Sequence, residues 1–317
     1  MMLKGLNLVL SIITFLFLFF ILNEYFYTSL GIALSLYLFI DFVDKLGKIF
    51  PLKEFMLVIA STQWIGGAKL SYSFGALHHK YYMYVDEPIY MEFVVPGVIL
   101  FALGLHVVYN NMNLKPLKDY FSKDTRALKG TGITLLSFGF ISSIIREFIS
   151  IPQLAFFLFL GNIAIYVGVI FFFFIYPKHK FKIYILVIGL VFIISLSSGM
   201  FHNLLLIAAF LSFFLVSEKT NFITKFFIIV LGSVFVYALQ GIKSDYREII
   251  WRKEVSNPIP IFTELFLEQF KGENEDIIYI SEVDPNEENA DINNRINQGW
   301  IISKIMANVP KYHPFEG

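Results

Sequence analysis

The sequence predicts an all-α protein: a polytopic bundle of about nine transmembrane helices, followed by a polar C-terminal segment with short amphipathic helices. The chain of 317 residues is 56% hydrophobic, whereas soluble domains contain about 45–50% apolar residues. The apolar residues are grouped into long stretches between positions 6 and 242, and lysine and arginine concentrate in every second loop between them. Length, hydropathy and charge pattern therefore all favour a chain that crosses a membrane several times.

The apolar stretches define the predicted spans in order. A helix needs about 20 apolar residues to cross the hydrocarbon core. Several stretches are shorter, so neighbouring helices or local thinning of the bilayer must cover the difference. The nine predicted spans comprise residues 6–22, 27–43, 55–70, 93–108, 130–145, 154–176, 183–196, 204–216 and 226–239. The first is interpreted as a retained span rather than a signal peptide, because Asn23-Glu24 follows it in place of a small-residue cleavage site.

Basic residues mark one side of the predicted bundle. The loops after the second, fourth, sixth and eighth spans are rich in them, and the loops in between are nearly free of them. The residues concerned are Lys45, Lys48, Lys53, Lys115, Lys118, Lys123, Arg126, Lys129, Lys178, Lys180, Lys182, Lys219 and Lys225. Because basic residues resist crossing during insertion, this side is predicted to be cytoplasmic. The N-terminus then lies in the cytoplasm, and the C-terminal segment lies in the periplasm beside a bacterial inner membrane.

Several classes of function are disfavoured by what the sequence lacks. There is no cysteine, so disulfides and thiolate metal sites are excluded. The formal net charge is zero, so no basic field indicates nucleic acid. The sequence holds no phosphate-cradling glycine loop, no His-Glu-x-x-His and no nucleophile elbow. The adjacent His78 and His79 point in different directions on any regular element, and a metal site there would need Asp86 or Glu87 to fold back, so we predict no metal site at this pair.

Polar residues inside the predicted spans are few. Lys69, Arg146 and Glu147 lie at span ends, where long side chains can reach the interface. Asn162 and Gln63 lie within spans and are predicted to hydrogen-bond between helices. This set is too sparse for the proton relay of an ion-coupled pump.

The composition changes after Gln240, which divides the chain into a transmembrane bundle, 1–242, and a periplasmic segment, 243–317. Apolar residues at helical spacing predict an amphipathic helix over 261–270, suited to lying on the membrane or capping the bundle. An acidic stretch follows over 272–291, and the helical period predicts a second helix over 292–309.

Two parts of this segment carry candidate binding chemistry. Lys243 and Arg247 lie four residues apart, so a helix continuing out of the ninth span would place both on one face. The planar fork of arginine suits a diphosphate, whose oxygens it binds in pairs. The second part, Arg295-Ile296-Asn297-Gln298-Gly299-Trp300, combines a guanidinium, two amides and a large aromatic ring. Alternatively, the cations only pair with Asp245 or Glu248, and Trp300 only anchors the segment at the interface.

These parts also carry a resemblance to a known family. The matching pieces are Gln240-x-x-Lys243-x-x-Tyr246-Arg247, Asn294-Arg295-x-Asn297-Gln298-Gly299-Trp300-Ile301-Ile302, Met306-x-x-Val309-Pro310 and Pro314-Phe315-x-Gly317. With the Ser198-Gly199-Met200-Phe201-His202 turn and the many spans, they resemble bacterial O-antigen or oligosaccharide repeat unit polymerases, which are related in architecture to the O-antigen ligases. The resemblance implies further spans beyond Gly317, so the chain is expected to be C-terminally incomplete and, if so, inactive.

The resemblance implies a glycosyltransferase that joins oligosaccharide repeat units carried on undecaprenyl diphosphate, outside the inner membrane, without a metal or cofactor. Its catalytic residues would be Arg247 and Arg295, which neutralise the diphosphate as the glycosidic bond breaks. Its substrate-binding residues would be Lys243, Tyr246, Gln298 and Trp300. It further implies contact with membrane lipids, and a chain-length regulator and a flippase as partner proteins. Glu248, His202 and the acidic stretch are unranked candidates for the general base.

Two other classes of function remain open. A transporter or flippase of lipid-linked oligosaccharide would need polar residues along a path through the bundle, whereas these spans are nearly all Phe, Leu, Ile and Val. A non-catalytic sensor or assembly protein would use the C-terminal segment only for binding, and Arg247 and Arg295 would then be dispensable.

Overall fold

The computed structural model describes residues 2–74, 82–108, 119, 125–148, 152–252, 257–271 and 297–309. Within these ranges the secondary structure is helical, apart from one isolated bridge between Leu46 and Ile49. Six of the described helices are long and apolar enough to cross a membrane, and two shorter apolar helices, Gly5–Ile21 and His202–Leu215, accompany them. The prediction of an all-α polytopic membrane bundle is thus confirmed.

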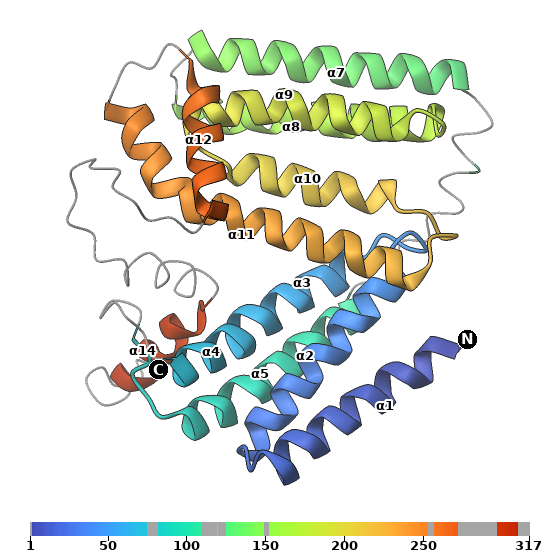
Figure 1. Cartoon of the computed structure of the whole chain (residues 1–317). Coiled ribbons are helices and arrows are strands. Elements are labelled where there is room, and N and C mark those ends of the chain that lie inside the picture. The colour runs from blue at the N-terminus through green and yellow to red at the C-terminus, as the bar shows by residue number, and fades with distance from the viewer. Residues whose placement is uncertain are drawn as a thin grey trace.

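The helices form two groups, which lie one above the other in Figure 1. The first helix group contains α1 (Met2–Leu16), the π-helix η1 (Phe17–Ile21), α2 (Phe26–Lys45), α3 (Leu52–Ser61), the π-helix η2 (Thr62–Gly66), α4 (Gly67–Phe74) and α5 (Glu87–Val108). The second helix group contains α7 (Thr125–Phe148), α8 (Pro152–Ile175), α9 (Lys180–Ser198), α10 (His202–Leu215), α11 (Phe222–Arg252) and α12 (Pro258–Lys271). A last helix, α14 (Gly299–Asn308), packs on the first group.

Each predicted span overlaps a helix, although two differ in form. The first predicted span, 6–22, is built from α1 and η1. The third predicted span, 55–70, is built from α3, η2 and α4, which follow one another without a break. The π-helical turn η2 contains Gln63 and Trp64. Such turns interrupt the regular α-helical bonding and are frequent at functional sites.

The first helix group is closely packed where α2 meets η2 and α5. A Cβ on Gly31 would lie 2.8 Å from a methyl carbon of Val95 and 2.9 Å from one of Ile65. Ile65 and Val95 are themselves fully buried. Glycine therefore lets three helices approach where any larger side chain would force them apart.

The α7–α8 hairpin is also built on glycine. On α7, Gly132 and Gly139 face α8, and on α8, Gly161 and Gly168 face α7. Each pair is spaced by seven residues, which returns both glycines to one side of a helix. Ser143 donates a hydrogen bond across this contact to Asn162 at 2.8 Å, so the packing role predicted for Asn162 is confirmed.

The two groups meet at one end of the bundle through an aromatic junction. It joins Phe39, Phe42, Phe50 and Phe55 of the first group to Phe210, Phe213, Phe214 and Phe226 of the second. Lys225 donates to the backbone oxygen of Leu46 at 2.6 Å, and Lys180 donates to that of Leu215. The described basic loops thus gather at this end, which we call the basic end.

The described parts of the C-terminal segment, namely the end of α11, α12 and α14, lie at the opposite end, which we call the tail end (Figure 1). The expected division at 242/243 falls inside α11, which continues to Arg252. The helix predicted over 261–270 is confirmed as α12, which packs on α9 and α11. The helix predicted over 292–309 is α14, which packs on α4 and η2; residues 292–296 lie outside the described part. Both helices cap the bundle.

Candidate functional site

The end of α11 positions the first part of the predicted site. Because α11 is continuous from Phe222 to Arg252, Lys243 and Arg247 lie one turn apart on the same face. The part of α11 that is apolar enough to span a membrane ends at Lys243, so both cations lie at the polar boundary of the bundle. Their side chains are half-buried.

Tyr246 lies beside these cations but points into the protein. Its side chain is fully buried between α9 and α12, and its hydroxyl donates to the backbone oxygen of Leu196 at 2.7 Å. Burial raises the pKa of Tyr246 to about 12. We predicted that Tyr246 binds substrate; in this conformation its hydroxyl holds α9 and is not open to a ligand.

Arg247 is fixed against the turn between α9 and α10. Its Nε donates to the backbone oxygen of Gly199 at 2.9 Å, and its guanidinium carbon lies 5.2 Å from the ring centre of Trp251. Gly199 has a φ of +66°, a left-handed conformation that favours glycine. A Cβ there would also lie 3.3 Å from Cγ of Arg247, so the bare backbone permits the close approach.

Trp251 is a residue of this region that the sequence reasoning missed. Its indole nitrogen donates to the backbone oxygen of Ser198 at 3.1 Å, yet the side chain is 60% exposed. Its position four residues after Arg247 was a usable signal, because side chains at this spacing meet on a helix.

The second part of the predicted site lies on the first helix group. Gln298 is the N-cap residue of α14, and Trp300 packs against the core formed by α4 and α5. Asn297 is fully buried and donates to Ser71 Oγ at 2.8 Å. At Gly299, a Cβ would overlap the hydroxyl of Tyr90. Arg295, which we predicted to be catalytic, lies outside the described residues.

The two parts of the predicted site are therefore held by different helix groups. The end of α11 packs with α9 and α12, whereas α14 packs with α4 and η2. Figure 1 shows both at the tail end, with α14 beside α4 and α5 and the end of α11 beside α12. The structure thus places both parts at the same end of the bundle but on separate supports.

Lys69, which we predicted to reach the interface from a span end, is held in a group of charged side chains at the tail end. Its ammonium binds Glu24 at 2.7 Å and Glu87 at 3.0 Å, and these side chains are 14–25% exposed. Thr28 donates to the same Glu87 oxygen at 2.8 Å. This tail-end ionic cluster ties the α1–α2 turn, α2, α4 and α5 together. Sequence reasoning missed it because its members come from three stretches that are far apart in the sequence.

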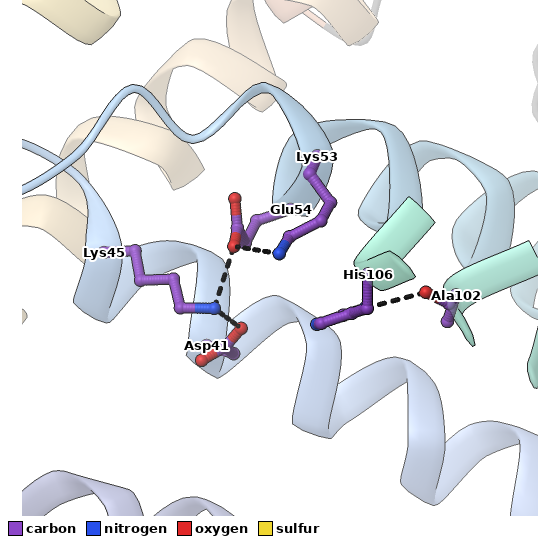
Figure 2. Close-up of polar contacts among 6 residues, drawn as sticks. All are labelled: Asp41, Lys45, Lys53, Glu54, Ala102 and His106. Carbon is purple, nitrogen blue, oxygen red and sulfur yellow. Dashed lines mark hydrogen bonds and ion pairs between the residues drawn. The ribbon is translucent and has the colours of Figure 1, made fainter. Parts of the chain in front are cut away.

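A second ionic network lies at the basic end, and Figure 2 shows Lys45 between Asp41 and Glu54. Lys45 Nζ is 2.7 Å from Asp41 and 2.8 Å from Glu54, and Lys53 Nζ is 3.8 Å from the same Glu54 oxygen. Glu54 and Lys53 are 2% and 6% exposed. Lys45 thus links Asp41 of α2 to Glu54 of α3 and holds the end of α2 against the start of α3. Removing one partner would leave a buried charge uncompensated.

Within the described ranges, no group of three or more His, Cys, Asp or Glu residues is arranged to hold a metal ion. Comparison of the chain with protein-family models, with curated proteins and with solved structures gives no match.

Proposed function

We propose that this protein is a membrane glycosyltransferase that joins oligosaccharide repeat units carried on polyprenyl diphosphate, at the outer face of the inner membrane. In the reaction, the bond between the anomeric carbon of the donor sugar and the diphosphate oxygen breaks. The diphosphate leaves with the electron pair, and a hydroxyl oxygen of the acceptor forms the new glycosidic bond. The proton of that hydroxyl passes to water.

The observation that carries the proposal is the fixed guanidinium of Arg247 at the polar boundary of the bundle. The carbonyl of Gly199 and the ring of Trp251 both contact it and restrict its position. A donor fixed before the reaction stabilises charge that develops on the leaving diphosphate, and such stabilisation is often the largest catalytic effect. Lys243, one turn earlier, adds a second cation on the same face.

The proposal includes the orientation of the bundle. Lys45, Lys53, Lys180 and Lys225 lie in the first or last turn of their helices at the basic end. Because basic loops are retained in the cytoplasm, we infer that the basic end is cytoplasmic and that the tail end faces outward. Gln298 and Trp300 of α14 then lie on the same side of the membrane as Arg247.

The direct test is replacement of Arg247 in the chromosomal gene. We expect Arg247→Ala to abolish long surface glycan, and to slow release of polyprenyl diphosphate by purified protein about 100- to 1,000-fold, as removal of one transition-state donor does elsewhere. Arg247→Lys should restore little, since an ammonium cannot reproduce the two-pronged fork.

Lys304→Ala supplies a matched control, because Lys304 is a cation at the same end that lies over the ring of Tyr84. It should leave the glycan ladder unchanged. Long glycan in the Arg247→Ala strain, with normal amounts of protein in the membrane, would remove the catalytic assignment.

The tail-end ionic cluster favours a second candidate, a flippase for the same lipid-linked oligosaccharide. Ionisable groups within a membrane bundle frequently mark transport paths, and Lys69, Glu24 and Glu87 are largely buried. Proteoliposomes distinguish the two. A flippase moves the lipid-linked sugar between leaflets with no new glycosidic bond, whereas the transferase forms that bond and releases polyprenyl diphosphate.

A further inference from the structure

We propose that Trp251 is a positioning residue that sets the direction of the Arg247 guanidinium toward a diphosphate. This inference rests on the proposed function, because it concerns the same site. It assigns a role to a residue that lies outside the set predicted from the sequence, and it names the chemical group that the pair recognises.

Two contacts of different kinds hold the guanidinium. The ring of Trp251 lies under it at 5.2 Å from guanidinium carbon to ring centre, within the range of a cation–π contact. The hydrogen bond from Nε to Gly199, at 2.9 Å, acts in the plane of the guanidinium. The ring limits movement of the guanidinium on one side, and the hydrogen bond limits movement of Nε. Together they restrict the directions that the two terminal nitrogens can take.

Trp251 is itself fixed by the turn that binds Arg247. Its indole nitrogen donates to Ser198 at 3.1 Å, one residue before the carbonyl that Arg247 binds. A Cβ at Gly199 would lie 3.4 Å from that nitrogen. The turn, the indole and the guanidinium thus form one unit, in which displacement of the indole would release the guanidinium.

Packing alone does not account for Trp251. The side chain is 60% exposed, and neighbouring Met200 is 53% exposed. A tryptophan retained for core burial would be covered. The competing explanation is an interfacial anchor, since tryptophan is enriched at the membrane–water boundary. An anchor would affect insertion and lipid contact, whereas a positioning residue would affect binding through Arg247.

The ligand chemistry follows from the direction of the fork. The two terminal nitrogens of arginine donate parallel hydrogen bonds that match paired phosphate oxygens. Because the guanidinium is already held in place, binding costs less side-chain conformational entropy than it would with a flexible arginine. Free diphosphate and lipid-linked diphosphate share this group, so the experiment must compare them.

The test measures binding of farnesyl diphosphate and of inorganic pyrophosphate to the purified full chain in detergent. We expect Trp251→Ala to weaken diphosphate binding about 2- to 30-fold, the range that loss of a cation–π contact spans. Trp251→Phe should retain most of the affinity because a ring remains under the guanidinium. In the Arg247→Ala background, Trp251→Ala should have no further effect, since it acts through Arg247.

A preference for farnesyl diphosphate over pyrophosphate would identify the lipid-linked form as the ligand, and equal affinities would identify the diphosphate itself; both support the positioning role.

Ser197→Ala is the matched control. It removes a hydrogen bond to Ile193 near the same turn without touching Arg247, and it should bind diphosphate like the wild type. Wild-type affinity in Trp251→Ala would overturn the proposal, as would an equal loss with or without Arg247. An equal loss of binding to phosphatidylglycerol vesicles would also overturn it, in favour of an interfacial anchor.

Failure of the proposed function gives a different result. If the Trp251 and Arg247 variants behave as expected but the protein releases no polyprenyl diphosphate from lipid-linked oligosaccharide, the glycosyltransferase proposal fails and the positioning role stands. If transfer occurs and Trp251→Ala changes neither binding nor rate, the positioning role fails and the glycosyltransferase proposal stands.

Discussion

Side chains of α11 satisfy the carbonyl groups at the end of α9, where a helix leaves its last carbonyls without partners in its own backbone. Tyr246, Arg247 and Trp251 donate to the backbone oxygens of Leu196, Gly199 and Ser198, respectively. The turn between α9 and α10 is therefore bound by the buried phenol of Tyr246, the guanidinium of Arg247 and the exposed indole of Trp251. The three residues differ in burial, so their contributions to stability and to ligand binding can be separated.

The Tyr246 hydroxyl gives a prediction about pH. Its folded pKa of about 12 lies above the ordinary tyrosine pKa of about 10. Its contribution to stability is therefore fully present below about pH 10 and is lost as the pH rises from there toward 12. We expect Tyr246→Phe to lower the melting temperature at pH 8, and the difference from wild type to shrink by pH 11, as measured by scanning fluorimetry in detergent.

The control for this measurement is Tyr237→Phe, because Tyr237 lies on the same helix and is 50% exposed. Its melting difference from wild type should stay small at both pH values. A difference for Tyr246→Phe that does not change with pH would contradict the assignment of the shift to this hydroxyl.

At the scale of the elements, small residues decide how closely the helices approach. Lipid chains are as apolar as leucine, so helices in a membrane associate through close packing and hydrogen bonds rather than through exclusion of water. The glycines of α7 and α8 provide that closeness, and Ser143 and Asn162 add one hydrogen bond. The hairpin therefore depends on positions where no side chain is present.

Gly139 is the position where this dependence can be measured. A Cβ there would lie 2.5 Å from a side-chain carbon of Ile165 and 2.7 Å from its backbone nitrogen, so the helices must separate. We expect Gly139→Ala to destabilise the protein by about 1–3 kcal/mol, a typical cost of overpacking, seen as a lower melting temperature. Gly189→Ala on α9 is the control, because nothing lies within 4 Å of its added Cβ. Equal melting temperatures for the two variants would contradict the packing argument.

At the scale of the whole molecule, the two helix groups meet at the basic end and each carries one helix of the C-terminal segment at the tail end. The aromatic junction joins the groups at the basic end. At the tail end, α12 packs on the second group and α14 on the first. Ser303 anchors α14 by accepting hydrogen bonds from the backbone nitrogens of Tyr84 at 2.7 Å and Val85 at 3.1 Å. The C-terminal segment thus contributes to the assembly of the bundle.

The docking of α14 can be tested at Asn297, which is fully buried and donates to Ser71 Oγ at 2.8 Å. We expect Asn297→Ala to destabilise the protein by about 1–3 kcal/mol, because it removes a buried hydrogen bond and leaves Ser71 without this donor; the readout is a lower melting temperature. Asn308→Ala is the control, because the hydrogen bond from Asn308 to the backbone oxygen of Lys304 is exposed. Equal melting temperatures for the two variants would contradict the docked position.

Sequence reasoning performs best for features that depend on local composition. The nine apolar stretches each overlap a helix, and the helical period of residues 261–270 predicts α12, because burial of an apolar face has the same periodicity in any surroundings. The packing role of Asn162 is also predictable, since an amide within a membrane needs a neighbouring partner. The partners of Lys69 are not, because Glu24 and Glu87 lie 45 and 18 residues away and only folding brings them together.

The sequence by itself determined that this protein is an α-helical membrane bundle and that its basic loops alternate, because both depend on composition along the chain. Only the tertiary structure decided that Tyr246 points inward, that Arg247 is held between Gly199 and Trp251, and that Trp300 belongs to the other helix group. The physical reason is that the direction of a side chain depends on which helix packs beside it. That choice is made by close approach at glycines and by long-range hydrogen bonds, which leave little trace in local sequence.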